Sequence, residues 1–533
     1  MVEFLELPID ILPVILRFVV KSSHLAAGAL VDKTWNEFAT PRLYERVSIF
    51  SWHKDAKTKV LLLFKTLSTC PHLAKHVRQL EVRDFPKAIL HLPTSSDETS
   101  IPDLVLEGIK NCKGLHSCVW TRDGSLSSEI LEALSWIASL RQLELNGRSQ
   151  GQYDPRLLAH FKGLQKVSII MPSSAVVSQL QSMMKVSGGN LRSVTIICKS
   201  SPVLTDATLE EMAPNLPNLE QFFITGCPKV TERGVSAIVS STQAGLRELG
   251  LEGVSPKFDM RAFAQHCTHI NALQFLCSII LTTPPSLNTT FHSTAAVGDE
   301  PANDSRLEAE WIAWTQSVNH LLSASPHFER FQLYATSTSS ATTELVRGLW
   351  LNHVLSAFWA ELVRLHGATI KRFSVLRMAI GEDGVRAICL GCPGLEELFI
   401  VSDKRSLDAL PNVFRLATNL RTIHVNFPLR SSTSTHVSRN DDSEASGSDS
   451  EEHSPEHEDL LDPSRPLPFL LPAEALALVK RCGPSVTQFG CNTKVWRVGR
   501  KVSRALDGTV EAEVVLLPYE SPDIPEPFLV VRT

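Results

Sequence analysis

Four cysteines recur at one place in the sequence pattern, and regularly spaced thiols could bind a metal or act as nucleophiles. Cys112, Cys267, Cys392 and Cys482 each stand three or four residues before an apolar segment of the form Leu-x-x-Leu-x-Leu. Cys70 is a looser match, seven residues before such a segment. Because a free cysteine usually behaves as a small buried hydrophobe, we expect these residues to pack where a helix turns into a strand.

The other residue types that could do chemistry do not form a catalytic pattern. The sequence has no HExxH zinc motif, no Walker A loop and no GxGxxG dinucleotide loop. Its histidines show no spacing typical of metal ligands. We therefore expect a protein that is not an enzyme and that uses no metal or cofactor.

The helices and strands that would position any functional residue cannot all pack around one compact core. The chain has 533 residues, of which 43% are hydrophobic and 20% charged, with a net charge of −5. A chain of this length needs several domains or an elongated array whose units contact their neighbours. The charge does not indicate a nucleic-acid partner, although a local basic patch is compatible with it.

The compartment is expected to be the cytoplasm, the nucleus or both. The first residues, MVEFLELPID, have no basic start and carry Glu3, so no secretory signal is expected. Apolar runs such as Phe275 to Leu281 are far shorter than the ~18 residues of a membrane span, so no membrane partner is expected. An odd number of cysteines, eleven, argues against a disulfide framework.

Segments of the form Leu-x-x-Leu-x-Leu recur at a nearly constant step. From Leu115 to Ile270 the steps are 25, 24, 27, 28, 27 and 24 residues, and from Ile370 to Leu420 they are 25 and 25. The segments begin at Val77, Leu115, Leu140, Leu164, Leu191, Leu219, Leu246, Ile270, Phe328, Ile370, Leu395, Leu420 and Val486. This periodicity indicates a repeat protein.

Each repeat predicts one strand and one helix. Positions four and six of each segment are apolar around a more polar residue, as in a strand with one buried side. Stretches with helix character lie between the strands, such as Leu126–Ile137 and Asp206–Met212. One such pair cannot bury its apolar face alone, but stacked copies share a continuous core. We predict an α/β fold, a right-handed solenoid with a parallel concave sheet and outer helices.

The segment 219–235 is similar to the cysteine-containing leucine-rich repeat, whose consensus is L-x-x-L-x-L-x-x-C-x-x-I-T-D-x-G-L. Cys227, Thr231 and Gly234 match this consensus, and Glu232 stands where aspartate is usual. Most other repeats lack the cysteine after the strand, so the array is degenerate. The resemblance covers roughly residues 70–430, with one more repeat near 472–495, and it implies a leucine-rich-repeat solenoid.

The first fifty residues predict three short helices. In the first helix the aliphatic residues follow helical spacing, with Asp10 as the expected N-cap and Pro13 in the first turn, where a missing N–H costs nothing. A second stretch ends near Leu30, and a third is built around Trp35 and Phe38. Three helices this short leave an apolar face uncovered.

This N-terminal segment resembles the F-box motif, with Leu-Pro, paired aliphatics, a Leu-Val-x-Lys-x-Trp block and Pro-x-Leu-Tyr. The resemblance implies docking on the Skp1-type adaptor of a cullin-RING ubiquitin ligase. Asp10 replaces the more usual glutamate, and Pro13 is unusual, so the first turn can differ. A helical cap on the first repeat is the alternative role, and both roles are compatible. The residues that the resemblance implies in adaptor binding are Leu7, Pro8, Ile11, Leu12, Ile15, Leu16, Leu30, Val31 and Trp35.

Two interruptions divide the repeat pattern. The step of 58 residues from Ile270 to Phe328 indicates a surface insertion near 280–310. Residues 431–466 are poor in apolar and rich in acidic residues, which predicts a disordered linker. We expect an F-box-like domain at 1–50, a solenoid at 51–430, the linker, and the last repeat with a tail at 467–533. The tail is expected to close the last repeat or to reach into the concave face.

The recognition surface is expected on the concave face, where the x positions of each segment point away from the core. Phe223 and Phe399 would be exposed aromatic anchors unless the insertion or the tail covers them, and His424 would face solvent. Arg141, Arg192 and Arg247 would form a basic row that Glu144 and Glu248 partly cancel, so no acidic partner is inferred. The candidate residues for target binding are Arg141, Lys166, Arg192, Phe223, Arg247 and Phe399.

The two resemblances together imply the substrate-recognition subunit of a Skp1–cullin–F-box ubiquitin ligase. Such a subunit brings a target protein close to the transferred ubiquitin, so its contribution is proximity. The alternative is a leucine-rich-repeat scaffold that binds proteins without a role in ubiquitin transfer. Neither function requires catalytic residues, and neither identifies the target.

We predict phosphorylation of Ser446 and Ser448, because each has an acidic residue three positions on, as acidophilic kinases prefer. The alternative is an unmodified, solvated linker. Mass spectrometry of the native protein is expected to find phosphate on these serines. Finding both serines always unmodified would contradict the prediction.

Overall fold

The computed structural model describes residues 9–19, 21–50, 55–85, 100–283, 300–335, 352–402, 404–427, 470–504 and 510–519. The chain divides into two units between Thr336 and Ser337, and each unit is described by itself. Leu7, Pro8, the linker 431–466 with Ser446 and Ser448, and the tail after residue 519 lie outside the described residues.

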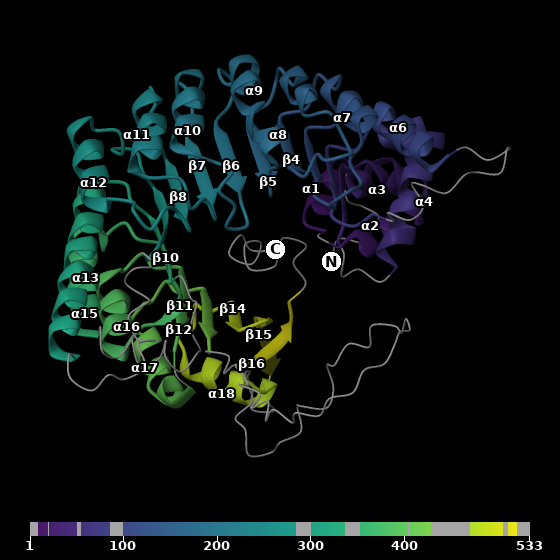
Figure 1. The fold of residues 1–533 in the computed structure, drawn as a ribbon. Helices are drawn as coiled ribbons and strands as arrows, with labels where there is room; N and C mark the ends of the chain where they lie inside the picture. The colour runs from purple at the N-terminus through teal and green to yellow at the C-terminus, as the bar shows by residue number, and fades with distance from the viewer. Residues whose placement is uncertain are drawn as a thin grey trace, which may run out of the picture. The chain divides into compact units, whose positions relative to one another are not determined.

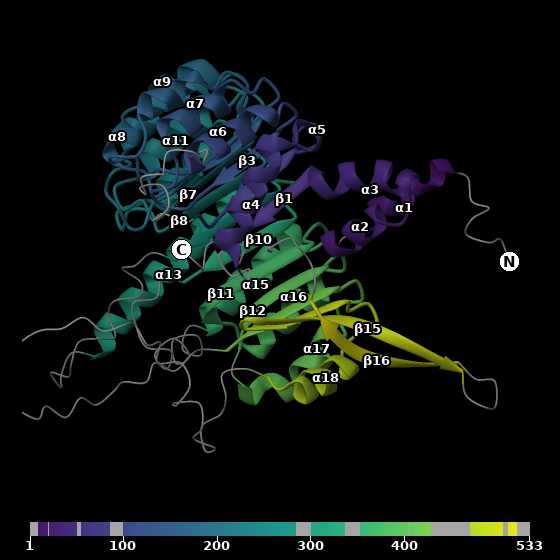
Figure 2. The same cartoon turned by 90° about the vertical axis from the view of Figure 1, so that its right-hand side faces the viewer.

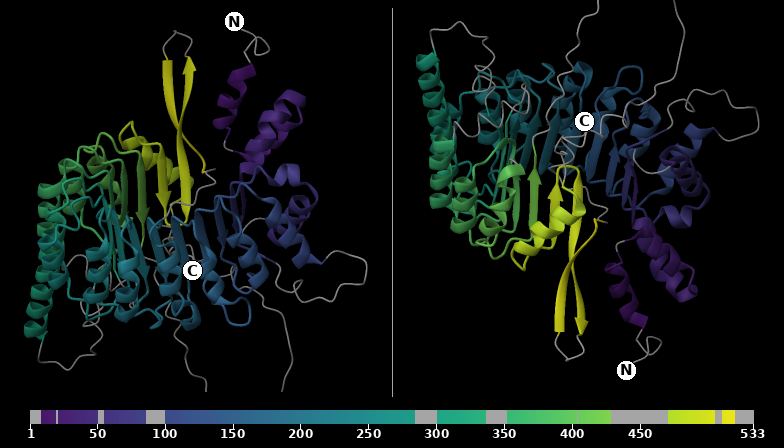
Figure 3. Two further views of the ribbon diagram at one scale, coloured as in Figure 1. Left: turned by 90° about the horizontal axis from the view of Figure 1, so that it is seen from above. Right: turned by 90° about the horizontal axis from the view of Figure 1, so that it is seen from below.

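The first unit begins with the three predicted helices. A 3-10 turn at Ile9–Ile11 leads into α1 (Leu12–Arg17), followed by α2 (Ser22–Ala29) and α3 (Lys33–Glu45). Helix α3 leads directly into the first strand. Figure 3 shows these helices in purple at the N-terminal end of the array.

The described strands of unit 1 form a parallel sheet in which each strand pairs with the next one along the chain. The strands are β1 (Arg46–Ile49), β2 (Gln79–Val82), β3 (Ser117–Trp120), β4 (Gln142–Asn146), β5 (Lys166–Ile170), β6 (Ser193–Ile197), β7 (Gln221–Thr225), β8 (Glu248–Glu252), β9 (Ser278–Thr282) and β10 (Arg330–Tyr334). Sequential parallel pairing requires a crossover between strands, and the helices provide it.

Within unit 1 the strands line the inner side of an arc and the helices its outer side (Figure 1). The connecting helices are α4 (Ala56–Thr69), α5 (Pro71–Ala74), α6 (Ile101–Asn111), α7 (Ser128–Ser135), the 3-10 helix η4 (Pro155–His160), α8 (Ser174–Val177), α9 (Leu180–Ser187), α10 (Asp206–Met212), η5 (Ala213–Asn215), α11 (Glu232–Ser241), α12 (Met260–His269) and α13 (Glu300–Ser323). The fold class is therefore the predicted α/β leucine-rich-repeat solenoid.

Unit 2 continues the same repeat and ends in a hairpin (Figure 2). Its parallel strands are β11 (Arg372–Ala379), β12 (Glu397–Val401), β13 (Thr422–Asn426) and β14 (Gln488–Cys491). Strands β15 (Lys494–Arg504) and β16 (Val510–Pro518) then pair antiparallel, β15 with β14 and β16 with β15. The helices are α15 (Asn352–His366), α16 (Glu382–Gly391), η8 (Lys404–Asp408), α17 (Leu410–Phe414) and α18 (Pro472–Arg481).

The core is the seam between the strands and the outer helices. Positions four and six of the repeat are buried, as with Leu143 and Leu145 on β4, which are 2% and 0% exposed. Full burial of one such side chain stabilises the fold by about 1.5–3 kcal/mol. The strand order brings equivalent residues into register, since Leu143 pairs with Val167 of β5. The seam is therefore continuous from one repeat to the next.

The Thr-Asp-x-Gly part of the repeat consensus joins one repeat to the next. Oδ1 of Asp206, in the first turn of α10, accepts hydrogen bonds from the backbone N–H groups of Thr231 (2.8 Å) and Gly234 (3.2 Å), and its Oδ2 accepts one from Thr231 Oγ1 (2.7 Å). A Cβ on Gly234 would lie 2.6 Å from Asp206 Oδ1, so glycine permits this approach. Glu232 makes the equivalent contact in the next repeat, accepting from the N–H of Asp259 (3.0 Å).

The predicted strand segments are confirmed except at Ile270. Helix α12 continues to His269, and Ile270 and Phe275 are 38% and 44% exposed. The strand β9 begins eight residues later at Ser278, and the segment that fits the pattern begins at Leu276. The prediction was wrong because Ile270 and Leu276 both open an apolar segment, and the earlier one forms the turn that follows α12.

Two further elements differ from the predictions. Strand β1, in the sequence Arg-Val-Ser-Ile before the first predicted segment, was missed; its alternating apolar residues Val47 and Ile49 are the signal that could have found it. The insertion predicted near 280–310 is in part a helix, because α13 starts at Glu300 and takes the crossover position between β9 and β10.

Replacing Asp206 with alanine is expected to lower the free energy of unfolding by about 1–3 kcal/mol, because three donors lose a charged acceptor. Urea denaturation followed by circular dichroism measures the change. Glu310→Ala is the control, since Glu310 forms an exposed ion pair with Arg306 on α13 (3.2 Å) and such pairs contribute little. Equal small effects of both variants would contradict the proposed contact between repeats.

Candidate protein-binding surfaces

The N-terminal helices form a small core of their own. Leu12 and Leu16 of α1 pack with Leu25 of α2 and Ala39 of α3. Helix α3 begins at an N-cap, because Asp32 Oδ1 accepts a hydrogen bond from the N–H of Trp35 (2.8 Å). These contacts set the angle between α2 and α3, and with it the position of the turn that joins them.

Large apolar side chains remain exposed on this segment. Leu30 and Val31, in the turn between α2 and α3, are 85% and 61% exposed. Ile11, Val14 and Phe18 are also exposed. An open groove beside the turn is lined by Ala29, Leu30, Asp32, Lys33, Asn36 and Glu37. Leu30 and Val31, adjacent in sequence, therefore form an exposed apolar turn, the kind of surface that can bind another protein.

The residues predicted to bind an adaptor separate into two groups. Ile11, Leu30 and Val31 are exposed, and Ile15 and Trp35 are half-buried. Leu12 and Leu16, at 8% and 3% exposed, belong to the small core of the helices, and their contact with an adaptor stays a prediction.

The first turn of α1 also differs from the prediction. Asp10 is not the N-cap; the helix begins at Leu12, with Ile11 at the cap and Pro13 at the second helical position. The preceding residues form a 3-10 turn. Pro13 remains in the first turn, where its lack of an N–H is tolerated.

The inner face of the unit 1 sheet presents aligned rows of polar side chains. The pairing of β7 with β8 and of β8 with β9 places Gln221, Glu248 and Ser278 side by side. The residue before each of these strands forms a second row, which contains Glu220, Arg247 and Cys277. Side chains of one row are therefore within reach of their neighbours on adjacent strands.

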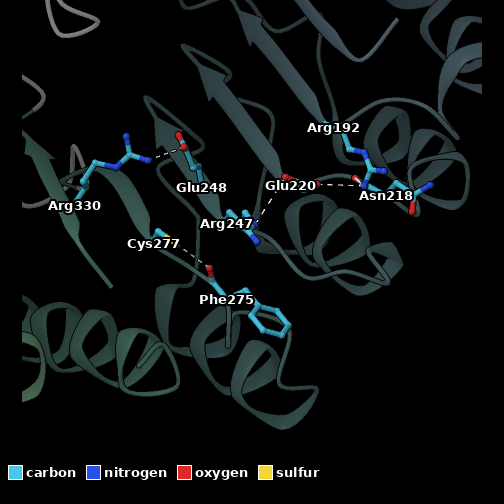
Figure 4. A network of polar contacts seen from close by, with 8 residues as sticks. All are labelled: Arg192, Asn218, Glu220, Arg247, Glu248, Phe275, Cys277 and Arg330. Carbon is cyan, nitrogen blue, oxygen red and sulfur yellow. Dashed lines mark hydrogen bonds and ion pairs between the residues drawn. The ribbon is translucent and has the colours of Figure 1, made fainter. Parts of the chain in front are cut away.

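Ion pairs link these rows between β6 and β10 (Figure 4). Glu220 lies between two arginines, 3.2 Å from Arg192 Nη1 and 3.9 Å from Arg247 Nε. Glu248 pairs with Arg330 at 2.7 Å. Cys277 Sγ donates to the carbonyl of Phe275 at 3.3 Å. The side chains of Arg192 and Arg247 remain 49% and 63% exposed.

The predicted basic row is partly neutralised, and by a different carboxylate from those expected. Glu144 pairs with Arg83 on the earlier repeat (3.0 Å), and Glu248 pairs with Arg330. The carboxylate that contacts the row is Glu220, which the sequence interpretation did not name. Arg141 folds back onto the carbonyls of Ala138 (2.7 Å) and Leu140 (3.0 Å), while Lys166 is exposed.

Phe223 is a half-buried aromatic on the inner face of unit 1. Its ring lies over Gly250 of β8, where a Cβ would stand 2.3 Å from Phe223 Cδ1. Ile280, two strands away, is also half-buried. The ring therefore lies sideways along the sheet and presents one side to solvent, which fits a flat contact surface better than a projecting anchor.

Phe399 and His424 of unit 2 are buried, so the predictions that they face solvent were wrong. Phe399 is 5% and His424 2% exposed. Their rings stack with centroids 5.9 Å apart, and the Arg372 guanidinium lies 5.0 Å from the Phe399 centroid. Gly490 on β14 leaves room for the imidazole, since a Cβ there would stand 2.1 Å from His424 Nδ1. Contacts between neighbouring strands cover both rings, and the spacing of residues in the sequence does not predict such contacts.

Three of the cysteines of the repeat are buried thiols, as predicted, whereas Cys482 and Cys70 are half-buried. Cys112, Cys267 and Cys392 are 0–1% exposed, and Cys112 Sγ donates to the carbonyl of Gly108 at 3.2 Å. Burial raises the pKa of each of these three thiols to about 12. They are therefore protonated at neutral pH, and a protonated thiol is neither a nucleophile nor a metal ligand.

Two chemical motifs that the sequence interpretation overlooked have no catalytic geometry. Gly147-Arg-Ser-Gln-Gly151 matches the nucleophile pattern GxSxG, but Ser149 is 4% exposed and its Oγ lies 3.0 Å from Ser173 Oγ. Cys389 and Cys392 are spaced as C-x-x-C, yet burial raises the pKa of both to about 12. A serine bonded to a second serine, and a pair of neutral thiols, do not form an active site.

The described part of the chain contains no metal-binding cluster and no membrane-spanning helix. No group of three or more His, Cys, Asp or Glu side chains there is placed to hold a metal ion. None of the described helices combines the length and the hydropathy that a bilayer crossing requires.

The likeness to known proteins is confined to solved structures, since no family model and no curated protein matches the chain. A chain from the crystal structure of the Rad7 and Elc1 complex in yeast matches with 14% identity and a TM-score of 0.35, covering 70% of this chain and 89% of that one. The leucine-rich-repeat-containing protein LegL7 from Legionella pneumophila matches with 12% identity and a TM-score of 0.35, covering 59% and 84%.

A third match is a chain from the TLR13–ssRNA13 complex, with 12% identity and a TM-score of 0.24. It covers 60% of this chain, which spans 44% of the matched one. All three identities and TM-scores are low. The assignment of the fold therefore rests on the strand register of the structure itself.

His424 is expected to make stability depend on pH. Burial lowers the pKa of His424 to about 4. Hydrogen bonds from Nε2 to Asn492 O (3.0 Å) and Asn426 Oδ1 (3.1 Å) raise the pKa, but by less than burial lowers it. The unfolded chain, with a histidine pKa near 6.5, binds the proton first as pH falls. Stability from this group is complete above pH ~6.5 and is lost toward pH ~4, by on the order of 3 kcal/mol.

Urea midpoints measured between pH 4 and 7 test this expectation. His424→Gln is expected to flatten the dependence relative to the wild type. His160→Gln, at an exposed position, is the control and should leave the dependence unchanged. An identical slope in the His424 variant and the wild type would refute the assignment.

Proposed function

We propose that this protein is the substrate-recognition subunit of a Skp1–cullin–F-box ubiquitin ligase. Its N-terminal helices bind the adaptor, and the inner face of its repeat array binds a target protein. The chain itself is not a catalyst in this role, because it contributes the proximity of target and ubiquitin. It would act in the cytoplasm, the nucleus or both.

The observation that carries the proposal is the exposed apolar turn between α2 and α3. Leu30 and Val31 carry the F-box resemblance and are among the most exposed large apolar side chains described. Apolar surface in water costs about 25 cal/mol per Å² relative to its buried state. Covering these side chains with an adaptor would recover that free energy.

The array supports the second half of the proposal. A solenoid presents an extended inner surface whose side chains are not needed for the core. Here that surface carries Phe223 and the Glu220 ion-pair network, while the apolar positions of the same strands face the helices. The geometry suits binding to a protein surface, and the target is not identified by it.

Capture of purified Skp1 by the full chain tests the adaptor role. Leu30→Asp together with Val31→Asp is expected to weaken capture by about tenfold or more, because two apolar contacts would be replaced by buried charge. Both residues are exposed in a turn, so the fold should persist. Biolayer interferometry on immobilised Skp1 measures the affinity.

Leu62→Asp is the matched control. Leu62 is a 58% exposed apolar residue on α4, and its replacement should leave capture within about twofold of the wild type. If the wild-type chain does not bind Skp1 at all, the ligase role is wrong and the scaffold function without a ubiquitin role remains.

A further inference from the structure

One edge of the unit 1 array concentrates positive charge. This edge consists of the turns that lead from each helix into strands β2 to β8, at residues 75–79, 112–117, 136–142, 161–166, 188–193, 216–221 and 242–247. We call it the basic rim. Its lysines and arginines are Lys75, Arg78, Lys113, Arg141, Lys162, Lys166, Arg192 and Arg247, and its carboxylates are Glu220 and, at the start of β8, Glu248.

The cations of the basic rim are available to solvent. All except the half-buried Arg141 are exposed. Neighbouring strands of a sheet lie about 4.8 Å apart, so charges on successive turns from β2 to β8 extend over roughly 30 Å. The chain as a whole carries a net charge of −5, which makes this local excess of positive charge a separate feature of the surface.

The hydrogen bonds at the basic rim do not neutralise it. Arg78 Nη1 donates to the carbonyl of Gly114 (3.0 Å), and Arg192 Nη1 donates to that of Asn218 (3.5 Å). A backbone carbonyl is a neutral acceptor, so these contacts position the guanidinium groups and leave their charge. Arg192 Nη1 also donates to Glu220 Oε1 (3.2 Å), and this carboxylate offsets one of the eight positive charges. The negative ends of the helix dipoles at the same edge offset only part of it.

The opposite edge of the same strands shows the contrast. Arginines there are paired with carboxylates, as in Arg122–Asp84 (3.6 Å), Arg156–Asp154 (2.7 Å) and Arg233–Glu210 (2.8 Å). The lysines of that edge, Lys199, Lys229 and Lys257, are exposed. At the basic rim, by comparison, Arg192 and Arg247 share Glu220. The excess of positive charge is therefore larger at the basic rim, where more cations stand in the turns than at the opposite edge.

We propose that the basic rim binds an acidic segment of a partner polypeptide, rich in aspartate, glutamate or phosphorylated residues, that runs across the edges of β2 to β8. This inference rests on the proposed function for the identity of that partner as the target. An extended chain of about ten residues covers roughly 30 Å. Carboxylate and phosphate groups are the ligands that arginine binds in bidentate fashion.

A peptide fits the basic rim better than a nucleic acid does. Proteins that bind single strands combine positive charge with successive aromatic side chains on which bases stack. The turns of the basic rim contain two aromatic residues, Trp136, which is 79% exposed, and Phe161, which is 2% exposed. One exposed ring does not make a stacking surface, whereas an acidic peptide needs none.

The test is a binding titration with the full chain. The probe is a fluorescein-labelled peptide of about twelve residues that alternates glutamate and serine, and the comparison peptide carries glutamine in place of glutamate. The Glu peptide is expected to bind saturably, more weakly with added salt, and at least about tenfold more tightly than the Gln peptide. Fluorescence anisotropy measures each dissociation constant.

Matched charge reversals locate the binding. Lys166→Glu, Arg192→Glu and Arg247→Glu in one chain replace exposed side chains and should weaken binding of the Glu peptide by about tenfold or more. Lys199→Glu, Lys229→Glu and Lys257→Glu change the net charge equally at exposed positions on the opposite edge. These control substitutions should change the dissociation constant by less than about threefold.

Three results would overturn the proposal. They are no saturable binding of the Glu peptide, equal losses in the two triple variants, or tighter binding of an oligothymidylate of equal length than of the peptide. Skp1 capture by the same variants separates this inference from the adaptor role. A rim variant that loses the peptide and keeps Skp1 supports both, and peptide binding without Skp1 capture leaves the rim as a peptide site on a scaffold.

Discussion

Burial of one apolar seam between stacked strands and helices is the constraint from which the rest of the structure follows. A single strand-helix pair has no second layer of its own, so each repeat is stable only against its neighbours. Parallel register keeps the seam continuous, and the Asp206 carboxylate ties two successive repeats together at the helix starts. Polar side chains are thereby left to the inner face, to the two edges and to the outer sides of the helices.

The edges differ because every crossover runs in the same direction. The helices that cross over between strands of unit 1 present their C-terminal ends to one edge of the sheet, where cations are favourable, and their N-terminal ends to the other. At the N-terminal edge, acidic caps such as Asp154 also bind arginines. At the C-terminal edge carbonyl groups accept the hydrogen bonds and the cations keep their charge. Because the backbone runs in one direction through every crossover, the two edges of the sheet differ in surface charge.

Much of the fold could be predicted from the sequence, because the leucine period reports burial directly. Twelve of the thirteen predicted segments became strands, and the exception at Ile270 arose where two apolar segments compete for one strand. The surface was harder to predict. Phe399 and His424 occupy positions that point away from the core, yet they cover each other along the sheet. The pairing of Glu144 with Arg83 and of Glu248 with Arg330 likewise depends on distances between strands that no linear spacing contains.

The reversal of strand direction after β14 has a consequence for how such an array can lengthen. Strand β15 returns antiparallel along β14 and occupies the hydrogen-bonding edge that another parallel strand would need. A duplicated repeat appended after β14 would need the free edge of a parallel strand to pair with, and the β15–β16 hairpin already covers that edge. New repeats can therefore be accommodated only between existing ones, and the hairpin sets the C-terminal limit of the array during its evolution.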